Sequence, residues 1–146
     1  MKLTEHFTDV ELGVVGADQR LVDNAAFLCR TVLEPIRVKF GPVNVHDGYR
    51  DPDHNHYVGG KPTSYHQFFG TRAAADIDAL PHGFWEVFDW ICLESGLPFD
   101  KVILEMNNMG NPSAIHIQVD SASTPRRLAY TGSTGAGYLY QAFPVK

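Results

Sequence analysis

The chain has 146 residues, which suffices for one domain with a hydrophobic core and is too short for two comfortable ones. Its formal net charge of −5 and its scattered Lys and Arg argue against a nucleic acid as the main partner, because phosphate contacts need clustered cations. No apolar run approaches the length of a membrane span, and no secretory signal stands at the start. We therefore expect one domain over residues 1–146 that binds neither nucleic acid nor membrane.

Helical patterns occur in the first third of the sequence and again after its middle. Thr8 stands three residues before Glu11, which is the spacing of a capping box and predicts a short helix there. From about Gln19 to Phe40 apolar residues recur at helical spacing, and Pro35 should bend or split this helix. A further amphipathic helix is predicted over residues 82–95.

The remaining segments alternate between strand-like runs and loops. The segment from Asp47 to Tyr65 is rich in Gly, Pro, Asp, Asn and His, and its length makes it a candidate functional loop. Residues 131–137 are glycine-rich but lack the Lys of a phosphate loop, which predicts a flexible turn. Strands are predicted at residues 43–46, 74–79, 101–105, 114–119 and 128–131. This order predicts an α+β fold with a small, mostly antiparallel sheet and flanking helices.

Two of the predicted strands carry a metal-capable side chain on the face opposite their apolar residues. Side chains alternate between the two faces of a strand, so His116 and Asp76 each lie opposite an apolar set. His66 precedes one of these strands, and Glu105 ends a third strand. Three protein ligands and one open position are typical of a catalytic zinc site. Such a zinc lowers the pKa of bound water to about 7, and a nearby carboxylate can take the proton.

The pattern alone leaves other interpretations open. A single His on a strand is more often a surface or hydrogen-bonded residue than a metal ligand, and an Asp at a strand end is usually a turn former. Asp78 has the same strand parity as Asp76 and is an alternative ligand. His46 either lines a cleft or is an ordinary loop histidine.

Several segments, taken in order, resemble a known family. The chain is similar over about residues 7–127 to the zinc D-alanyl-D-alanine carboxypeptidase family, especially its small branch in phage endolysins and bacterial wall enzymes. The segments are FTDVEL, LEPIR, VHDGYRDPDHNHYVGG, PTSYH, AAADI, FDKVILE and AIHI. The resemblance implies a compact α+β domain with an antiparallel sheet beside helices, a fold also seen in the hedgehog signalling domain.

The resemblance also implies a site. Zn²⁺ would be held by His66, Asp76 and His116. Glu105 would be the catalytic carboxylate, and Arg50 of the Gly-Tyr-Arg segment would bind substrate. The sequence departs from the family in the connection from His66 to Asp76, which is longer by about three residues. It also has Ala114 where some relatives carry another His.

The implied function is that of a zinc metallopeptidase hydrolysing peptide bonds of peptidoglycan stem peptides or cross-links, in wall lysis or remodelling. A phage endolysin is one kind of protein that would have this function. The protein would be a monomer with peptidoglycan peptide as its partner, cytoplasmic when made, and acting at the cell wall after release or as part of a virion. The alternative is a catalytically silent, zinc-containing wall-binding or phage structural module of the same fold.

Overall fold

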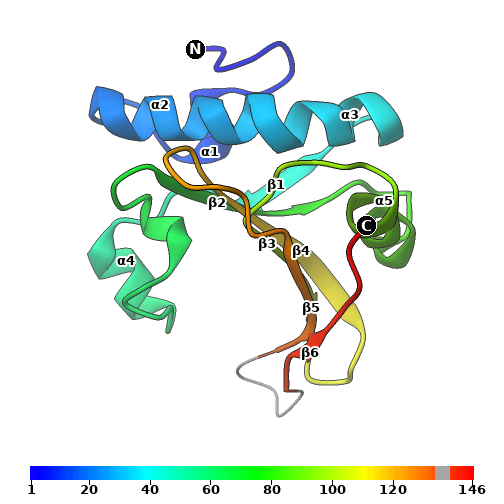
Figure 1. Cartoon of the computed structure of the whole chain (residues 1–146). Coiled ribbons are helices and arrows are strands. Elements are labelled where there is room, and N and C mark those ends of the chain that lie inside the picture. Colours follow the sequence, from blue (N-terminus) through cyan, green and yellow to red (C-terminus); the bar gives the residue numbers. More distant parts are fainter. Residues whose placement is uncertain (134–138) are drawn as a thin grey trace.

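The computed structural model describes residues 1–133 and 139–146, and a long helical segment lies across one side of its sheet (Figure 1). A short helix with the predicted capping box at Thr8 and Glu11 precedes it. The disturbance predicted at Pro35 takes the form of a π-helical turn just before it, because a wider turn accommodates the proline ring. These elements are α1 (Asp9–Leu12), α2 (Gln19–Leu28), the π turn (Cys29–Leu33) and α3 (Glu34–Phe40).

In the described part of the chain, six strands form one sheet in the order β1-β2-β4-β3-β5-β6. All neighbours pair antiparallel except β3 and β5, which are parallel. The strands are β1 (Asn44–Asp47), β2 (Arg72–Asp78), β3 (Lys101–Met106), β4 (Pro112–Asp120), β5 (Leu128–Gly132) and β6 (Gln141–Ala142). The predicted α+β fold with a mostly antiparallel sheet is confirmed, and β6 is an addition that sequence reasoning did not predict.

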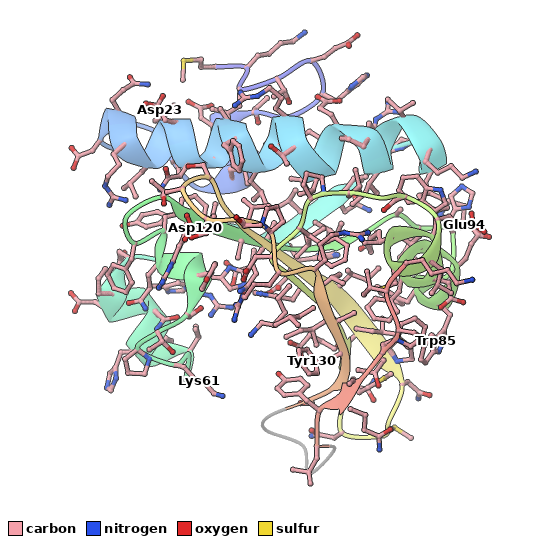
Figure 2. All side chains as sticks on the ribbon, in the orientation of Figure 1. Asp23, Lys61, Trp85, Glu94, Asp120 and Tyr130 are labelled. Atoms are coloured by element: carbon pink, nitrogen blue, oxygen red, sulfur yellow. The ribbon has the colours of Figure 1, made fainter. Side chains whose placement is uncertain are left out.

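The hydrophobic core lies between one face of the sheet and the helices α2, α3 and α5 (Phe84–Leu93). Ile115, Ile117 and Val119 of β4 point into it and are almost fully buried. Burial of such a side chain contributes about 1.5–3 kcal/mol, so this face anchors the sheet. Trp85 of α5 lies on one side of the sheet and Tyr130 of β5 projects on the other (Figure 2). The second face is therefore free to carry polar side chains.

The predicted loop over residues 47–65 contains a short helix, α4 (Pro52–Tyr57), and leads into the 3₁₀ turn η2 (Tyr65–Gln67). Asp51 caps α4 by accepting a hydrogen bond from the backbone N–H of His54, at 2.8 Å. Pro52 suits the first helical position because its missing N–H would have no partner there. Sequence reasoning missed α4 because six mostly polar residues show no hydrophobic periodicity.

The glycine-rich turn predicted over residues 131–137 lies mostly outside the described residues, and residues 131–132 belong to β5. None of the helices within residues 1–133 and 139–146 is both long and apolar enough to cross a membrane.

Candidate metal centre

Two histidines and one aspartate converge on the polar face of the sheet. The register of β2 and β4 pairs Asp76 directly with His116, and η2 brings His66 over them. Asp76 Oδ1 lies 3.2 Å from both His66 Nε2 and His116 Nδ1, and these two nitrogens are also 3.2 Å apart. Within the described part of the chain, this is the group whose ligand atoms all lie within 4.8 Å of one another and could hold a metal ion. Two imidazole nitrogens and one carboxylate oxygen are a donor set that suits Zn²⁺.

The orientation of His66 is fixed by the backbone of the segment after β1. His66 Nδ1 lies 2.8 Å from the carbonyl oxygen of Gly48, and because a carbonyl only accepts, Nδ1 must carry the proton. The lone pair of Nε2 then points toward Asp76. The N–H of Arg50 donates to the carbonyl of His66 at 2.7 Å, and the hydroxyl oxygen of Ser64 accepts from the N–H of His66 at 3.2 Å. His66 is therefore held both through its ring and through its backbone.

The longer connection between His66 and Asp76 is tied to α2. Arg20 and Asn24 donate to the carbonyl of Gly70 at 2.7 and 2.9 Å, and both also donate to the carbonyl of Phe68. The Phe68 side chain is fully buried, which anchors the same connection in the core. The additional residues thus form an anchored turn, and they do not keep the candidate ligands apart.

A chain of buried polar side chains orients His116 from the other side. His116 Nε2 lies 2.8 Å from Gln118 Oε1, and Gln118 Nε2 donates to Asp100 Oδ2 at 2.7 Å. Arg126 completes the chain with two hydrogen bonds to the Asp100 carboxylate, at 2.7 and 2.8 Å. Because the Gln118 amide nitrogen faces a carboxylate, its oxygen faces His116 and accepts from Nε2. Nδ1 of His116 is left for a metal ion.

Sequence reasoning did not single out Gln118, Asp100 or Arg126. The signal for Gln118 was present, since it stands two residues after His116 and so shares its strand face. No comparable signal identified Asp100, which precedes β3 and contacts Gln118, or Arg126, which precedes β5 and contacts Asp100.

The charges of Asp76 and His116 reinforce each other. Burial alone would raise the pKa of Asp76, but its hydrogen bonds with His116 and His66 outweigh burial and hold that pKa well below its usual range. Burial alone would lower the pKa of His116, but the Asp76 carboxylate raises it above its usual value. Without a metal ion the pair therefore favours a protonated imidazole, and a bound cation would displace that proton.

Glu105 stands at the edge of this cluster, beside an open cleft of about 480 Å³. The register of β3 and β4 pairs Ile103 with His116, so Glu105 lies one side-chain repeat further along the same face. Burial raises the pKa of the Glu105 carboxyl, and the negative charge of Asp76 adds to that rise against the opposing charge of His116. The hydroxyl of Tyr140 contacts both Glu105 oxygens, at 3.3 and 3.4 Å. Glu105 is placed to hold or release a proton near the cluster.

Arg50 lines the same cleft. Its Nε donates to Asp47 Oδ2 at 2.5 Å and its Nη1 to Asn55 Oδ1 at 3.3 Å. Its Nη2 lies 3.7 Å from Asp76 Oδ2. The guanidinium is thus held in place beside the candidate ligands and faces the open space before them.

Asp78 and His46 are engaged elsewhere. His46 Nε2 pairs with Asp78 Oδ2, and Asp78 Oδ1 accepts from Asn44 Nδ2 at 2.8 Å and from the N–H of Leu80 at 3.0 Å. Neither residue belongs to the candidate metal cluster or lines the cleft beside it, as far as the described residues show. The alternative of Asp78 as a ligand therefore gains no support from the geometry.

Comparison with known proteins identifies a family. The model of the family described as Peptidase M15 matches residues 2–118 of the 146. No curated protein and no solved structure gives a significant match. The matched range contains His66, Asp76, His116, Glu105 and Arg50, and it ends within β4.

Proposed function

The chain belongs to the peptidase M15 family, a family of metallopeptidases, and on this premise we propose that it is a zinc-dependent peptidase acting on peptidoglycan stem peptides or cross-links. The main support for the proposal is the geometry of the site. The candidate ligand atoms of His66, Asp76 and His116 converge within 4.8 Å at a cleft that Glu105 and Arg50 also line. The choice of peptidoglycan follows from the resemblance of the ordered segments to enzymes of the bacterial wall.

The chemistry divides between a metal ion and the protein's own residues. A zinc ion held by the cluster would polarise the scissile carbonyl and lower the pKa of a water molecule beside it. Glu105 accepts the proton from the attacking water and passes it to the leaving amine. The raised pKa of Glu105 suits this exchange, because a carboxyl that is too acidic would not hold the proton between the two steps.

Arg50 positions the substrate. Its guanidinium is oriented by Asp47 and Asn55, and its planar fork is suited to a carboxylate or a carbonyl of the peptide. Such a contact would place the scissile bond over the candidate metal cluster. Substrate orientation of this kind lowers the barrier because the reacting groups are already near each other.

The test is to incubate the protein with purified peptidoglycan and to analyse the products by mass spectrometry. Parallel samples contain a chelator, or a chelator followed by added zinc. We expect peptide-bond cleavage that disappears with the chelator and returns with zinc, and the fragment masses identify the bond. Zinc-loaded, folded protein that binds peptidoglycan from several wall types without releasing peptides would contradict the proposal and support the binding module.

A substitution separates catalysis from metal binding. Glu105→Gln should lower the hydrolysis rate by about 10²–10⁴-fold, because the general base is lost, while the zinc content stays that of the wild type. Glu94→Gln, a matched change at an exposed residue after α5, serves as the control and should leave the rate unchanged. Hydrolysis that survives in the Glu105 variant would show that another group takes the proton.

A further inference from the structure

The cleft has a charge opposite to that of the protein as a whole. The full chain has a formal net charge of −5. Among the described residues that line the cleft, five are Lys or Arg and two are Asp or Glu. The five cations are Arg50, Lys61, Arg72, Lys101 and Arg126. Arg50 lies beside the candidate metal cluster and Arg126 supports it through Asp100 and Gln118, so Lys61, Arg72 and Lys101 need a different explanation.

The register of the sheet places Lys101 on the far side of the cluster from Glu105. Lys101, Ile103 and Glu105 alternate with buried apolar residues of β3 and share the cleft face. Ile103 pairs with His116, whereas Lys101 pairs with Gln118. A strand rises about 3.4 Å per residue, so Lys101 stands roughly 7 Å along the strand from the level of the candidate metal.

The two lysines that line the cleft differ from Arg72 and Arg126, which line it too. Arg126 is held by Asp100, and Arg72 lies 3.5 Å from Asp120 and 4.8 Å from the centre of the Tyr65 ring. No hydrogen bond or ion pair engages the ammonium groups of Lys61 and Lys101 anywhere in residues 1–133 and 139–146. Each arginine is therefore held by a carboxylate, whereas among the described residues no carboxylate contacts either ammonium group directly.

Lys101 is also partly withdrawn from water. It is half-buried in β3, and burial lowers the pKa of its ammonium group; the charges of Arg126 and Lys61 lower that pKa further, against the opposing charges of Asp100 and Glu105. Lys61 is exposed, lines the same cleft, and lies near α4 and apart from the strands (Figure 2). An anion in the cleft that meets both ammonium groups would offset their repulsion, and each group would donate a charged hydrogen bond to it.

We propose that Lys61 and Lys101, backed by Arg126, form a subsite for a second carboxylate of the substrate, about two extended residues away from the scissile bond. The inference rests on the proposed function, because it assumes that a peptide lies along the cleft with its reactive bond at the candidate metal. It narrows the substrate class to acidic peptides. Arg50 and the lysine pair then bind groups at two separate points, which fixes the direction of the peptide.

The test measures binding separately from turnover. The zinc-loaded Glu105→Gln protein is titrated calorimetrically with two synthetic stem pentapeptides. One carries its free carboxylates, and in the other every carboxylate except the C-terminal one is a primary amide. We expect the acidic form to bind about tenfold more tightly, since a hydrogen bond between charged groups contributes at least this much in a partly buried site.

Substitutions assign the difference to the lysines. Lys61→Met with Lys101→Met, in the same background, should abolish the preference for the acidic peptide and leave the affinity for the amidated form unchanged, which also shows that the variant is folded. Lys39→Met removes an exposed charge of α3 and should keep the preference. Equal affinity for both peptides, no binding of either, or a preference that survives the double substitution would overturn the subsite. Failure of the proposed function would show differently, as a preference in binding without any cleavage by the wild type.

Discussion

The two candidate histidine ligands present different ring nitrogens, and each choice has a local cause. His66 offers Nε2 because Gly48 occupies its Nδ1, whereas His116 offers Nδ1 because Gln118 occupies its Nε2. The first partner is a backbone carbonyl, which no side-chain substitution can remove. The second is a side chain, so the orientation of His116 can be tested by mutation.

Gln118→Leu should lower the zinc affinity by about 10–100-fold, the usual effect of losing the partner that orients a ligating imidazole. The substitution also removes the hydrogen bond that Gln118 Nε2 donates to the Asp100 carboxylate. Competition with a chromophoric chelator measures the affinity directly. Gln141→Leu, at an exposed position of β6, provides the matched control. An affinity equal to that of the wild type would show that Gln118 does not set the ring orientation.

At the residue scale, the sequence predicted the positions of the candidate ligands better than it predicted their hydrogen-bond partners. Strand alternation placed Asp76 and His116 on one face, and the structure brings them together with His66. Their hydrogen-bond partners depend on which backbone carbonyl or distant side chain meets each ring, and local sequence does not contain that information. Tyr140 reaches Glu105 from a segment beyond the matched family range and had no signal at all.

At the scale of elements, α1 and the segment after β1 approach each other closely at Gly48. A Cβ atom there would lie 2.6 Å from the carbonyl oxygen of Leu12, the last residue of α1. The N–H of Tyr49 donates to that same carbonyl at 2.9 Å. This contact holds the backbone segment after β1. The carbonyl of Gly48 in that segment orients His66. Glycine is needed here for space.

Gly48→Ala should therefore lower the free energy of unfolding by about 1–3 kcal/mol, as overpacking against backbone usually does. It should also weaken zinc binding, because the Gly48 carbonyl shifts together with the backbone. Denaturant titration measures the first effect and chelator competition the second. Gly83→Ala is the comparison, since nothing lies within 4 Å of a Cβ at that position and its cost is confined to weaker capping of α5. A variant as stable as this comparison would mean that the α1 contact relaxes without cost.

Most elements were predictable because their hydrophobic periods are clear. The apolar spacing in α2 and α3 and the runs in β2, β3 and β4 reflect one buried face each. Two features were not predictable on that basis. The helix α4 has no apolar stripe, and the short edge strand β6 exists because β5 offers it a pairing partner. The parallel pairing of β3 with β5 likewise depends on the whole topology.

For the molecule as a whole, the core and the candidate metal centre lie on opposite faces of the same sheet. The buried apolar cluster joins α2, α3 and α5 to the strands without using the cleft residues. The protein should therefore stay folded without metal, and zinc should add stability by binding to the native state alone. The gain is about 4 kcal/mol when the free zinc concentration is a thousand times its Kd.

Differential scanning calorimetry with zinc and with a chelator measures this gain as a difference in Tm. We expect one cooperative transition in both samples, at a lower temperature with the chelator, and a far-ultraviolet circular dichroism spectrum that is the same in both at 25 °C. His116→Ala is the control, because added zinc should no longer raise its Tm. Loss of the folded spectrum after chelation would show that the metal centre is part of the folding core.

The uneven distribution of charge affects how the protein meets its substrate. Because the cleft holds five of the twelve Lys and Arg residues and only two of the seventeen Asp and Glu residues, the rest of the surface is strongly acidic. An anionic polymer that approaches from most directions is repelled, and the approach toward the cleft is favoured. The electrostatic field thereby orients the polymer before any contact forms. This orienting effect weakens with added salt, because the field then extends only about 8 Å at physiological ionic strength.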